Sequence, residues 1–459
     1  MRCYRNIVKQ VSCYHLNSLV SGRMEIGMHH RALLIFLLIF SGMFVFSACS
    51  NAKNHTQAEP EKKDSKNQVM EDNKVMLSKV DIRKINVYAY IGDDGRLVNR
   101  ISYEVDDVKK IEGVKKEDFE IKIGDKSFAV KDIRIKENEL LLETEDFHYD
   151  GVDSYNSDFT VTHSDFSVIC TDPTLNFMKE NCLIHTKTLD NFVSGTFKAS
   201  NGCELPYWIY LPEDSGSSDV PLMVWEHGGG EVLSTSYEGA NITKNKGASI
   251  WIESGMDTAV LSFQYPENYS FGISSKPYEL KRMEEYNTVK YEFIQKLITD
   301  GQVDEKRLYI SGASSGGGAV LRFLMQYPDL FAAALPICAK DTLIPISEPY
   351  GLAFKMQGSL VISDDAYTKC YTEIKKLMSG YDITHIPIWF VQAENDPVCT
   401  SYTSKILFDI LMELGAESNR ITMYTNEEMA EKNLQSLHAS WIMAFNDPEI
   451  IKWIYEQSK

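Results

Sequence analysis

The sequence is short of positive charge. Its 459 residues contain 47 Lys and Arg against 65 Asp and Glu, which gives a formal net charge of -18. Nucleic-acid affinity comes mostly from Lys and Arg side chains that neutralise phosphates. We therefore expect no nucleic-acid partner.

Paired cysteines are also lacking. Nine cysteines are spread irregularly along the chain, and no Cys-x-x-Cys pair occurs. Such spacing fits neither a disulfide scaffold nor a zinc ribbon. We expect no metal and no cofactor.

A long apolar run is missing as well. The apolar stretch Ala32–Phe46 has 15 residues, whereas a membrane-spanning helix needs about 20. It follows a short basic region ending at Arg31 and precedes small residues, which is typical of a secretory signal. We predict a signal peptide over residues 1–48. A start at Met24 or Met28 would make residues 1–23 a wrongly assigned extension, and an uncleaved anchor helix is the alternative.

The residues Phe-Ser-Ala-Cys at 46–49 resemble a bacterial lipobox, in which the cysteine is lipidated and becomes the mature N-terminus. This resemblance predicts lipidation of Cys49. Residues 49–79 are polar and lack an apolar cluster, so they form a flexible tether. We therefore expect an extracytoplasmic protein that is held to the cell membrane by lipid or secreted.

Short alternating runs follow from residue 80 to about residue 190. Alternation of apolar and polar residues with a period of two is typical of half-buried strands. The runs are separated by turn sequences, and no helical stretch interrupts them. This pattern predicts a small all-β sandwich over residues 80–190.

From residue 191 to residue 459, apolar runs alternate with helical segments. The runs lie at 221–225, 258–262, 308–310, 333–337 and 386–391. Apolar runs without alternation are typical of strands buried on both faces. Their alternation with helices predicts an α/β domain with a mainly parallel central sheet.

A candidate nucleophile lies after the third of these runs. Residues 312–316 read Gly-Ala-Ser-Ser-Gly, with Ser314 at the centre, between a strand-like and a helix-like segment. This is the context of the nucleophile turn in α/β hydrolases. The alternative is a flexible loop rich in serine and glycine.

A serine nucleophile needs a base and an acid, which follow it in the order Ser, acid, His in such folds. Only His385 and His438 come after Ser314. His385 precedes a strand, where active sites of parallel sheets do not lie, so we choose His438. Asp396 follows the apolar run at 386–391 and is our candidate acid. Glu394 is the competing acid, and the alternative for Asp396 is a plain turn residue.

Residues 225–231 read Trp-Glu-His-Gly-Gly-Gly-Glu. Such loops present backbone N–H groups to a developing oxyanion. We predict that the N–H groups of Gly229 and Ser315 form the oxyanion hole, with Gly228 as the fallback. His227 is interpreted as a residue that braces the loop.

Residues of about 190–459 resemble secreted bacterial serine esterases of the α/β-hydrolase superfamily. The resemblance is to the polyhydroxybutyrate-depolymerase and feruloyl-esterase-like branch, which is related to prolyl-oligopeptidase-type hydrolases. It is carried by four segments: 224–231, 303–318, 327–334, and 438–441 with 445–449. It implies an immunoglobulin-like fold for the N-terminal sandwich. Ser315 differs from the Met or Gln common at that position.

The resemblance implies a serine esterase acting on a small-molecule or carbohydrate-linked ester, such as an acetyl or feruloyl ester. The long stretch 340–385 carries several aromatic residues and is interpreted as a cap, with a plain helical excursion as the alternative. A prolyl-oligopeptidase-like peptidase and a catalytically inert binding lipoprotein are the alternative functions.

Overall fold

The computed structural model describes residues 80–155, 161–213, 219–267, 277–340, 363–432, 434 and 436–459. The predicted signal peptide, Cys49 and the tether lie outside these residues. Within the described ranges, no helix combines the length and apolar character needed to cross a membrane.

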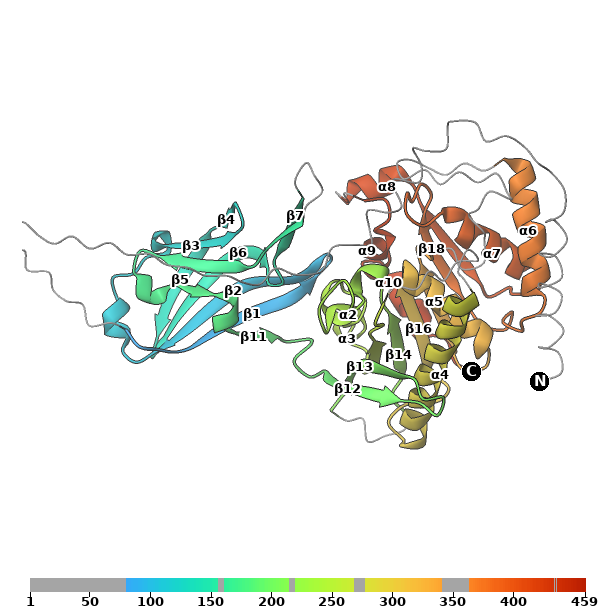
Figure 1. The fold of residues 1–459 in the computed structure, drawn as a ribbon, viewed down its shortest axis with the longest axis horizontal. Helices are drawn as coiled ribbons and strands as arrows, with labels where there is room; N and C mark the ends of the chain where they lie inside the picture. Colours follow the sequence, from blue (N-terminus) through green and yellow to red (C-terminus); the bar gives the residue numbers. More distant parts are fainter. Residues whose placement is uncertain are drawn as a thin grey trace, which may run out of the picture. The chain divides into compact units, whose positions relative to one another are not determined.

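The N-terminal part is an antiparallel β region, as the sequence predicted (Figure 1). A five-stranded sheet has the order β11-β1-β2-β6-β5, and a four-stranded sheet has the order β10-β9-β3-β4. The parallel pairing of β11 with β1 is the exception to the antiparallel pattern. The strand bounds are β1 (Ile82–Gly92), β2 (Gly95–Val105), β3 (Phe119–Ile123), β4 (Lys126–Phe128), β5 (Val130–Lys136), β6 (Glu139–His148), β9 (Phe166–Cys170), β10 (Phe177–Met178) and β11 (Leu183–Thr186).

Alternating burial explains how the two sheets pack. In β3, residues Phe119, Ile121 and Ile123 are buried, while the residues between them are half-buried. Inward-facing residues of both sheets, including Phe147 and Phe166, share one apolar core. A separate hairpin pairs β7 (Val152–Tyr155) with β8 (Val161–Ser164).

The C-terminal part contains an eight-stranded sheet of order β12-β13-β15-β14-β16-β17-β18-β19. β12 and β13 form an antiparallel hairpin, β13 is antiparallel to β15, and the remaining neighbours are parallel. The bounds are β12 (Val193–Lys198), β13 (Glu204–Tyr210), β14 (Leu222–Glu226), β15 (Ala259–Phe263), β16 (Leu308–Ala313), β17 (Ala333–Ile337), β18 (Trp389–Ala393) and β19 (Arg420–Tyr424). The predicted mainly parallel sheet is confirmed.

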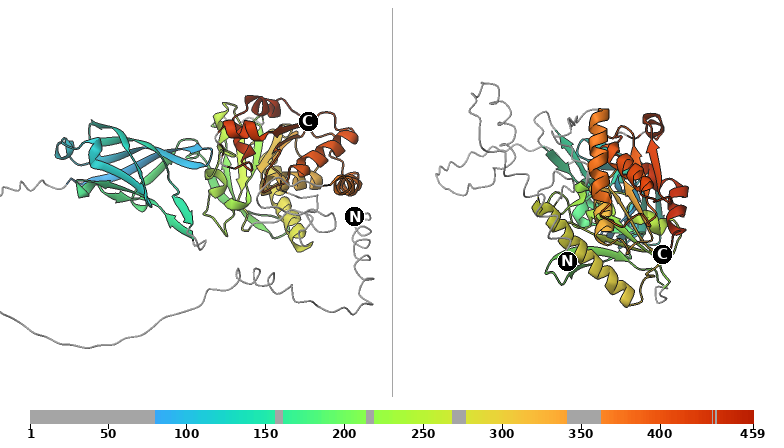
Figure 2. Two further views of the ribbon diagram at one scale, coloured as in Figure 1. Left: turned by 90° about the horizontal axis from the view of Figure 1, so that it is seen from above. Right: turned by 90° about the vertical axis from the view of Figure 1, so that its right-hand side faces the viewer.

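Both faces of this sheet are covered, which is why its strands read as continuous apolar runs. In β14, Leu222 and Val224 face one core cluster, and Met223 and Trp225 face another. The first cluster includes residues of α4 (Pro277–Thr299), α5 (Ser315–Gln326), α6 (Asp364–Met378) and α7 (Ser401–Glu413). In the right-hand view of Figure 2, α4 and α6 lie on the side of the sheet that faces the viewer.

The opposite face is covered by shorter helices. They contribute Trp251, Phe445 and Trp453, among others, to the second cluster. These helices are α2 (Ala240–Thr243), α3 (Ser249–Glu253), α9 (Ser440–Phe445) and α10 (Pro448–Tyr455). α8 (Asn426–Glu431) follows β19 and leads toward His438.

The stretch interpreted as a cap is only partly described, because residues 341–362 lie outside the described ranges. Its described helix, α6, packs against α7. The Tyr367 hydroxyl donates to Asp409 at 3.0 Å and the Tyr371 hydroxyl donates to Glu413 at 2.5 Å. These two tyrosines are therefore engaged with α7.

Candidate active site

The predicted site residues lie at the carboxyl ends of neighbouring parallel strands. Ser314 follows β16, Cys338 follows β17, Asp396 follows β18, and His438 follows β19 and α8. Since β16 to β19 are adjacent in the sheet, their carboxyl ends share one edge. This is the edge where open α/β sheets bind ligands.

Ser314 occupies a strained turn between β16 and α5. Its φ is 57°, a value that residues other than glycine rarely adopt. The backbone holds it there: the Ser314 N–H donates to Ile337 O at 3.0 Å, and Ser314 O accepts from Lys340 N–H at 2.8 Å. The half-buried side chain thus projects from a fixed position at the start of the helix.

The glycines on either side of Ser314 are required by space. A Cβ on Gly316 would lie 1.9 Å from Glu226 O, and a Cβ on Gly312 would lie 2.6 Å from Gly316 O. Neither distance is compatible with a side chain. The Gly-x-Ser-x-Gly pattern therefore lets α5 approach the end of β14 closely.

Asp396 and His438 form a direct pair. His438 Nδ1 lies 2.8 Å from Asp396 Oδ2, and the Asp396 side chain is fully buried. The other carboxylate oxygen accepts from the N–H groups of Val398 and Cys399, at 2.8 and 2.9 Å. Gln392 also donates to Oδ2 at 2.9 Å. These contacts fix the carboxylate beneath the imidazole.

Two buried cysteines, which sequence reasoning did not single out, join Ser314 to this pair. Cys399 Sγ lies 3.8 Å from Ser314 Oγ, and the Cys399 N–H binds Asp396. Cys338 lies between the two residues that hold the Ser314 backbone. One ligand atom each of Cys338, Asp396 and His438 lie within 4.8 Å of one another. Ser314 therefore lies next to two cysteines that in turn lie close to Asp396 or His438.

The cluster of Cys338, Asp396 and His438 could in principle hold a soft metal ion. However, His438 Nδ1 is already hydrogen-bonded to Asp396. A metal at that nitrogen would have to break the bond that orients the histidine.

The other two candidates lie elsewhere. Among the described residues, the carboxylates within 4 Å of the His385 imidazole are those of Asp329 and Asp382, both of which are exposed. Glu394 is exposed, and its N–H donates to Tyr424 O at 2.9 Å. Asp396, and not Glu394, is the acid beside His438.

The loop after β14 carries the predicted oxyanion donor Gly229, whereas the other predicted donor, Ser315, is the first residue of α5. The Gly228 N–H donates to Glu231 Oε2 at 2.8 Å, so it is already used. Among the described residues, no hydrogen bond from the Gly229 N–H is found. The geometry therefore favours Gly229 over the fallback Gly228 as a donor at this loop.

His227 braces the same loop. Its Nδ1–H donates to Gly228 O at 2.7 Å, and its Nε2 accepts from the Tyr265 N–H at 3.0 Å. Burial lowers the pKa of His227 to about 4, so the ring is neutral near pH 7. Both ring nitrogens are occupied, which leaves His227 no role as a base.

Glu231 holds the other side of the loop. It accepts from Gly228 N–H and, at 2.6 Å, from the Asn245 amide. Burial raises the pKa of Glu231 to about 8, while the hydrogen bonds from Gly228 and Asn245 oppose the rise. Its protonation state therefore changes within the range in which enzymes are assayed.

A buried ion pair lies beneath the loop. Lys290 Nζ in α4 is 2.6 Å from Glu226 Oε1, with both side chains almost completely buried. The Tyr265 hydroxyl donates to Glu226 Oε2 at 2.5 Å and accepts from Lys290 at 2.9 Å. Glu226 directly precedes His227, and its carbonyl abuts Gly316. This cluster therefore supports both the loop after β14 and the turn at Ser314.

Comparison with known proteins is consistent with this arrangement. Residues 287–430 match the model of the prolyl oligopeptidase family. The matched span includes Ser314 and Asp396, ends before His438, and covers under a third of the chain. No curated protein matches the chain.

Solved structures match over a larger part. A thermostable esterase aligns with 82% of this chain and 100% of its own, at 23% identity and a TM-score of 0.60. An acylaminoacyl peptidase from Pyrococcus horikoshii aligns with 80% of this chain and 63% of its own, at 14% identity and a TM-score of 0.40. A hyperthermophilic esterase from Pyrobaculum calidifontis aligns with 56% of this chain and 85% of its own, at 16% identity and a TM-score of 0.35.

The sheet order, its flanking helices and the likeness to the thermostable esterase lead to one structural conclusion. The chain has an α/β-hydrolase fold, with a mixed sheet of mostly parallel strands, preceded by an antiparallel β region.

Proposed function

We propose that this chain is a serine hydrolase that cleaves carboxylic esters. The observation that carries the proposal is the position of Ser314 on a strained turn at φ 57°, at the sheet edge where His438 and Asp396 form a hydrogen-bonded pair. The strained turn, the imidazole and the buried carboxylate are the parts of a catalytic triad.

In the proposed mechanism, Ser314 Oγ attacks the ester carbonyl carbon. Asp396 accepts a hydrogen bond from the Nδ1–H of His438, and this holds the tautomer in which Nε2 is unprotonated and can take the proton from the serine hydroxyl. The N–H groups of Gly229 and Ser315 stabilise the oxyanion. His438 then returns its proton to the departing alcohol, and water releases the acid from the acyl-enzyme by the same steps in reverse.

The choice of an ester substrate is supported by the likeness to the thermostable esterase, which aligns over its own full length. The thermostable esterase aligns with 82% of this chain, whereas residues 191–459 make up 269 of 459 residues, about 59%. The alignment must therefore extend into the β region. That region is also too short for a propeller, whose blades take about 40–50 residues each.

A peptidase is the second candidate, because residues 287–430 match the prolyl oligopeptidase family. The two are separated by a p-nitrophenyl ester and a p-nitroanilide with the same acyl group. We expect a higher kcat/KM for the ester, since its leaving group needs less assistance. A proline anilide hydrolysed as fast as the ester would favour the peptidase.

The substrate class that we propose is an acetyl or feruloyl ester of a carbohydrate. The resemblance noted in the sequence supports it, whereas Tyr367 and Tyr371 give it no support because they bind residues of α7. A panel of acetylated and feruloylated oligosaccharides beside simple nitrophenyl esters tests this choice. Turnover of the simple esters alone would contradict it.

We also propose that Cys49 is lipidated and that the protein is extracytoplasmic. The support is the lipobox-like sequence at 46–49, preceded by the apolar stretch. Cys49→Ala should release the protein into the medium or leave an uncleaved precursor. A mature N-terminus at an unmodified residue other than Cys49, identified by mass spectrometry, would contradict the proposal.

A further inference from the structure

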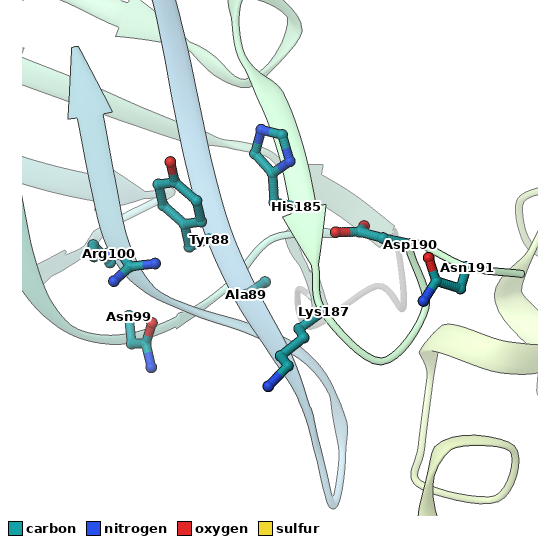
Figure 3. A pocket seen from close by; sticks show the side chains of 8 residues that line it. All are labelled: Tyr88, Ala89, Asn99, Arg100, His185, Lys187, Asp190 and Asn191. Carbon is teal, nitrogen blue, oxygen red and sulfur yellow. The ribbon is translucent and has the colours of Figure 1, made fainter. Parts of the chain in front are cut away.

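A hollow on the N-terminal β region lies outside the site described above. It has a volume of about 600 Å³ and is lined by residues of β1, β2, β11 and the turn that follows β11 (Figure 3). None of its residues takes part in the proposed catalysis. The kind of ligand that suits the hollow therefore depends on its own lining residues.

Three side chains form a row across the strands. Tyr88 of β1 is in register with Arg100 of β2 and with His185 of β11. The Arg100 guanidinium lies 4.1 Å from the centre of the Tyr88 ring, and the His185 ring stacks on Tyr88 at 5.2 Å. The cation–π contact places the Arg100 guanidinium over the Tyr88 ring.

A hydrogen bond to a buried residue holds His185, at one end of this row. His185 Nε2 lies 3.0 Å from Oδ1 of Asn86, a residue that is only 3% exposed. Because an amide oxygen only accepts, Nε2 carries a proton and Nδ1 is left for other partners. The imidazole is thus held in one orientation by a buried residue.

The cations at the hollow have no anionic partner among the described residues. Glu143 lies opposite Arg100 on β6, but it pairs with Arg134 at 2.9 Å. Lys187 likewise makes no ion pair within the described ranges. The nearby Asp190 uses Oδ1 to accept the Thr186 N–H at 2.8 Å, which closes the turn after β11.

Besides the Asp190 carboxylate, neutral hydrogen-bonding groups line the hollow. Tyr88, Asn99 and Asn191 line the same hollow, and they carry a hydroxyl and two side-chain amides (Figure 3). Cations beside several neutral donors and acceptors suit a ligand that carries both a carboxylate and hydroxyl groups.

We propose that this hollow binds a carboxylated sugar of the uronic acid type. Arg100 and Lys187 hold the carboxylate, and the Tyr88 hydroxyl, Asn99 and Asn191 hold the sugar hydroxyls. The proposal concerns binding alone and does not depend on the catalytic assignment. In a chain with a net charge of -18, it assigns a local anion site to the β region.

The test is calorimetric titration of the purified protein with trigalacturonate and with the neutral galactose trisaccharide. We expect binding of the acidic trisaccharide and at least about tenfold weaker binding of the neutral one, equal to about 1.4 kcal/mol. Equal affinity for the two, or no binding of trigalacturonate, would overturn the proposal. Displacement by succinate at equal concentration would contradict the assignment to a sugar.

Two double variants provide the matched comparison. Arg100→Gln with Lys187→Gln should lower trigalacturonate affinity about tenfold or more, because each cation contributes a charge-assisted hydrogen bond. Arg83→Gln with Lys131→Gln removes the same charge from exposed positions in the same region and should bind as the wild type does. Equal losses in both would show that only overall charge matters and would overturn the site. Circular dichroism and thermal unfolding confirm that both variants fold.

Discussion

The serine at the centre of the site has a backbone that is costly to form. A non-glycine residue at φ 57° raises the free energy of the folded protein by on the order of 1–3 kcal/mol. The hydrogen bonds donated by the Ser314 and Lys340 N–H groups hold the backbone in this conformation. In this conformation, Oγ lies at the start of α5 beside Cys399, whose N–H binds Asp396. Such strain supports a catalytic role for Ser314.

Removal of either end of the proton path should abolish ester turnover. Ser314→Ala and His438→Ala should each lower kcat on the order of 10⁴-fold or more, because triad residues act as a unit. Initial rates with a nitrophenyl ester measure the loss, and thermal unfolding verifies the fold. Activity within tenfold of the wild type in either variant would discard the assignment.

The two neighbouring acids provide a matched pair of variants. Asp396→Asn should lower kcat by about 10⁴-fold, because an amide favours the wrong imidazole tautomer. Glu394→Gln should leave kcat nearly unchanged, since its exposed side chain makes no contact with His438 within the described residues. If the Glu394 variant is the slower of the two, the acid is wrongly assigned.

Glu231 should make stability depend on pH. Burial raises its pKa to about 8 in the folded protein, from 4.5, so the folded state retains a proton that the unfolded chain has lost. Stability from this group is therefore lost as pH rises toward 8. Between pH 6.5 and 8 the loss is about 2 kcal/mol at most, at about 1.4 kcal/mol per unit.

Chemical denaturation of the wild type and of Glu231→Gln at several pH values isolates this contribution. The variant has no group to titrate at this position, so the stability difference between the two proteins should change with pH. His227, with its lowered pKa, acts between about pH 4 and 6.5 and is common to both. A difference that stays constant from pH 6.5 to 8 would show that Glu231 does not retain its proton.

At the scale of elements, the site depends on how α4 meets the end of β14. The pair of Lys290 and Glu226 joins this helix to this strand in the interior. A buried ion pair contributes little net stability, but loss of one partner leaves an unpaired buried charge. The pair therefore makes the contact specific and holds the residue before the oxyanion loop.

Lys290→Met should destabilise the fold by about 3–5 kcal/mol, because Glu226 would be left buried without a cation. The double variant Lys290→Met with Glu226→Gln should recover part of that loss, since it removes the charge and keeps an acceptor for Tyr265. Urea denaturation at pH 7 measures both. A double variant no more stable than the single one would show that the charge is not the cause.

The strand ends show what the sequence could predict about the elements. Apolar runs located β14 to β18 to within a few residues. The expected strand at 386–391 instead begins at Trp389, since Pro387 has no N–H to donate and the Ile388 N–H binds the Asn419 side chain. In β1, an irregularity in the pairing at Tyr88 and Ala89 breaks the alternation that an ideal strand would show.

Local sequence patterns predicted the triad candidates but not the residues that pack around them. The Gly-x-Ser-x-Gly turn and the order Ser, Asp, His are readable because each residue follows a strand. Lys290 lies 64 residues from Glu226 in the middle of a helix, and nothing in its neighbours distinguishes it from a surface lysine. Likewise, only the fold brings Cys338 and Cys399 next to the triad candidates. Long-range packing, which the sequence alone does not show, places all three.

At the scale of the whole molecule, the proposed chemistry and the proposed sugar binding belong to different parts of the chain. Catalysis uses the carboxyl edge of the eight-stranded sheet, and the anion site uses three strands of the β region. Each proposal has its own assay. The two proposals can therefore fail independently.

The central claim is that Ser314 is an activated nucleophile. A biotinylated fluorophosphonate, followed by peptide mass spectrometry, tests it most directly because the reagent modifies activated serines without reporting on substrate preference. The account predicts a single adduct on the peptide that contains Ser314, absent from Ser314→Ala and strongly reduced in His438→Ala. An unlabelled wild-type protein, or an adduct on another serine, would contradict it.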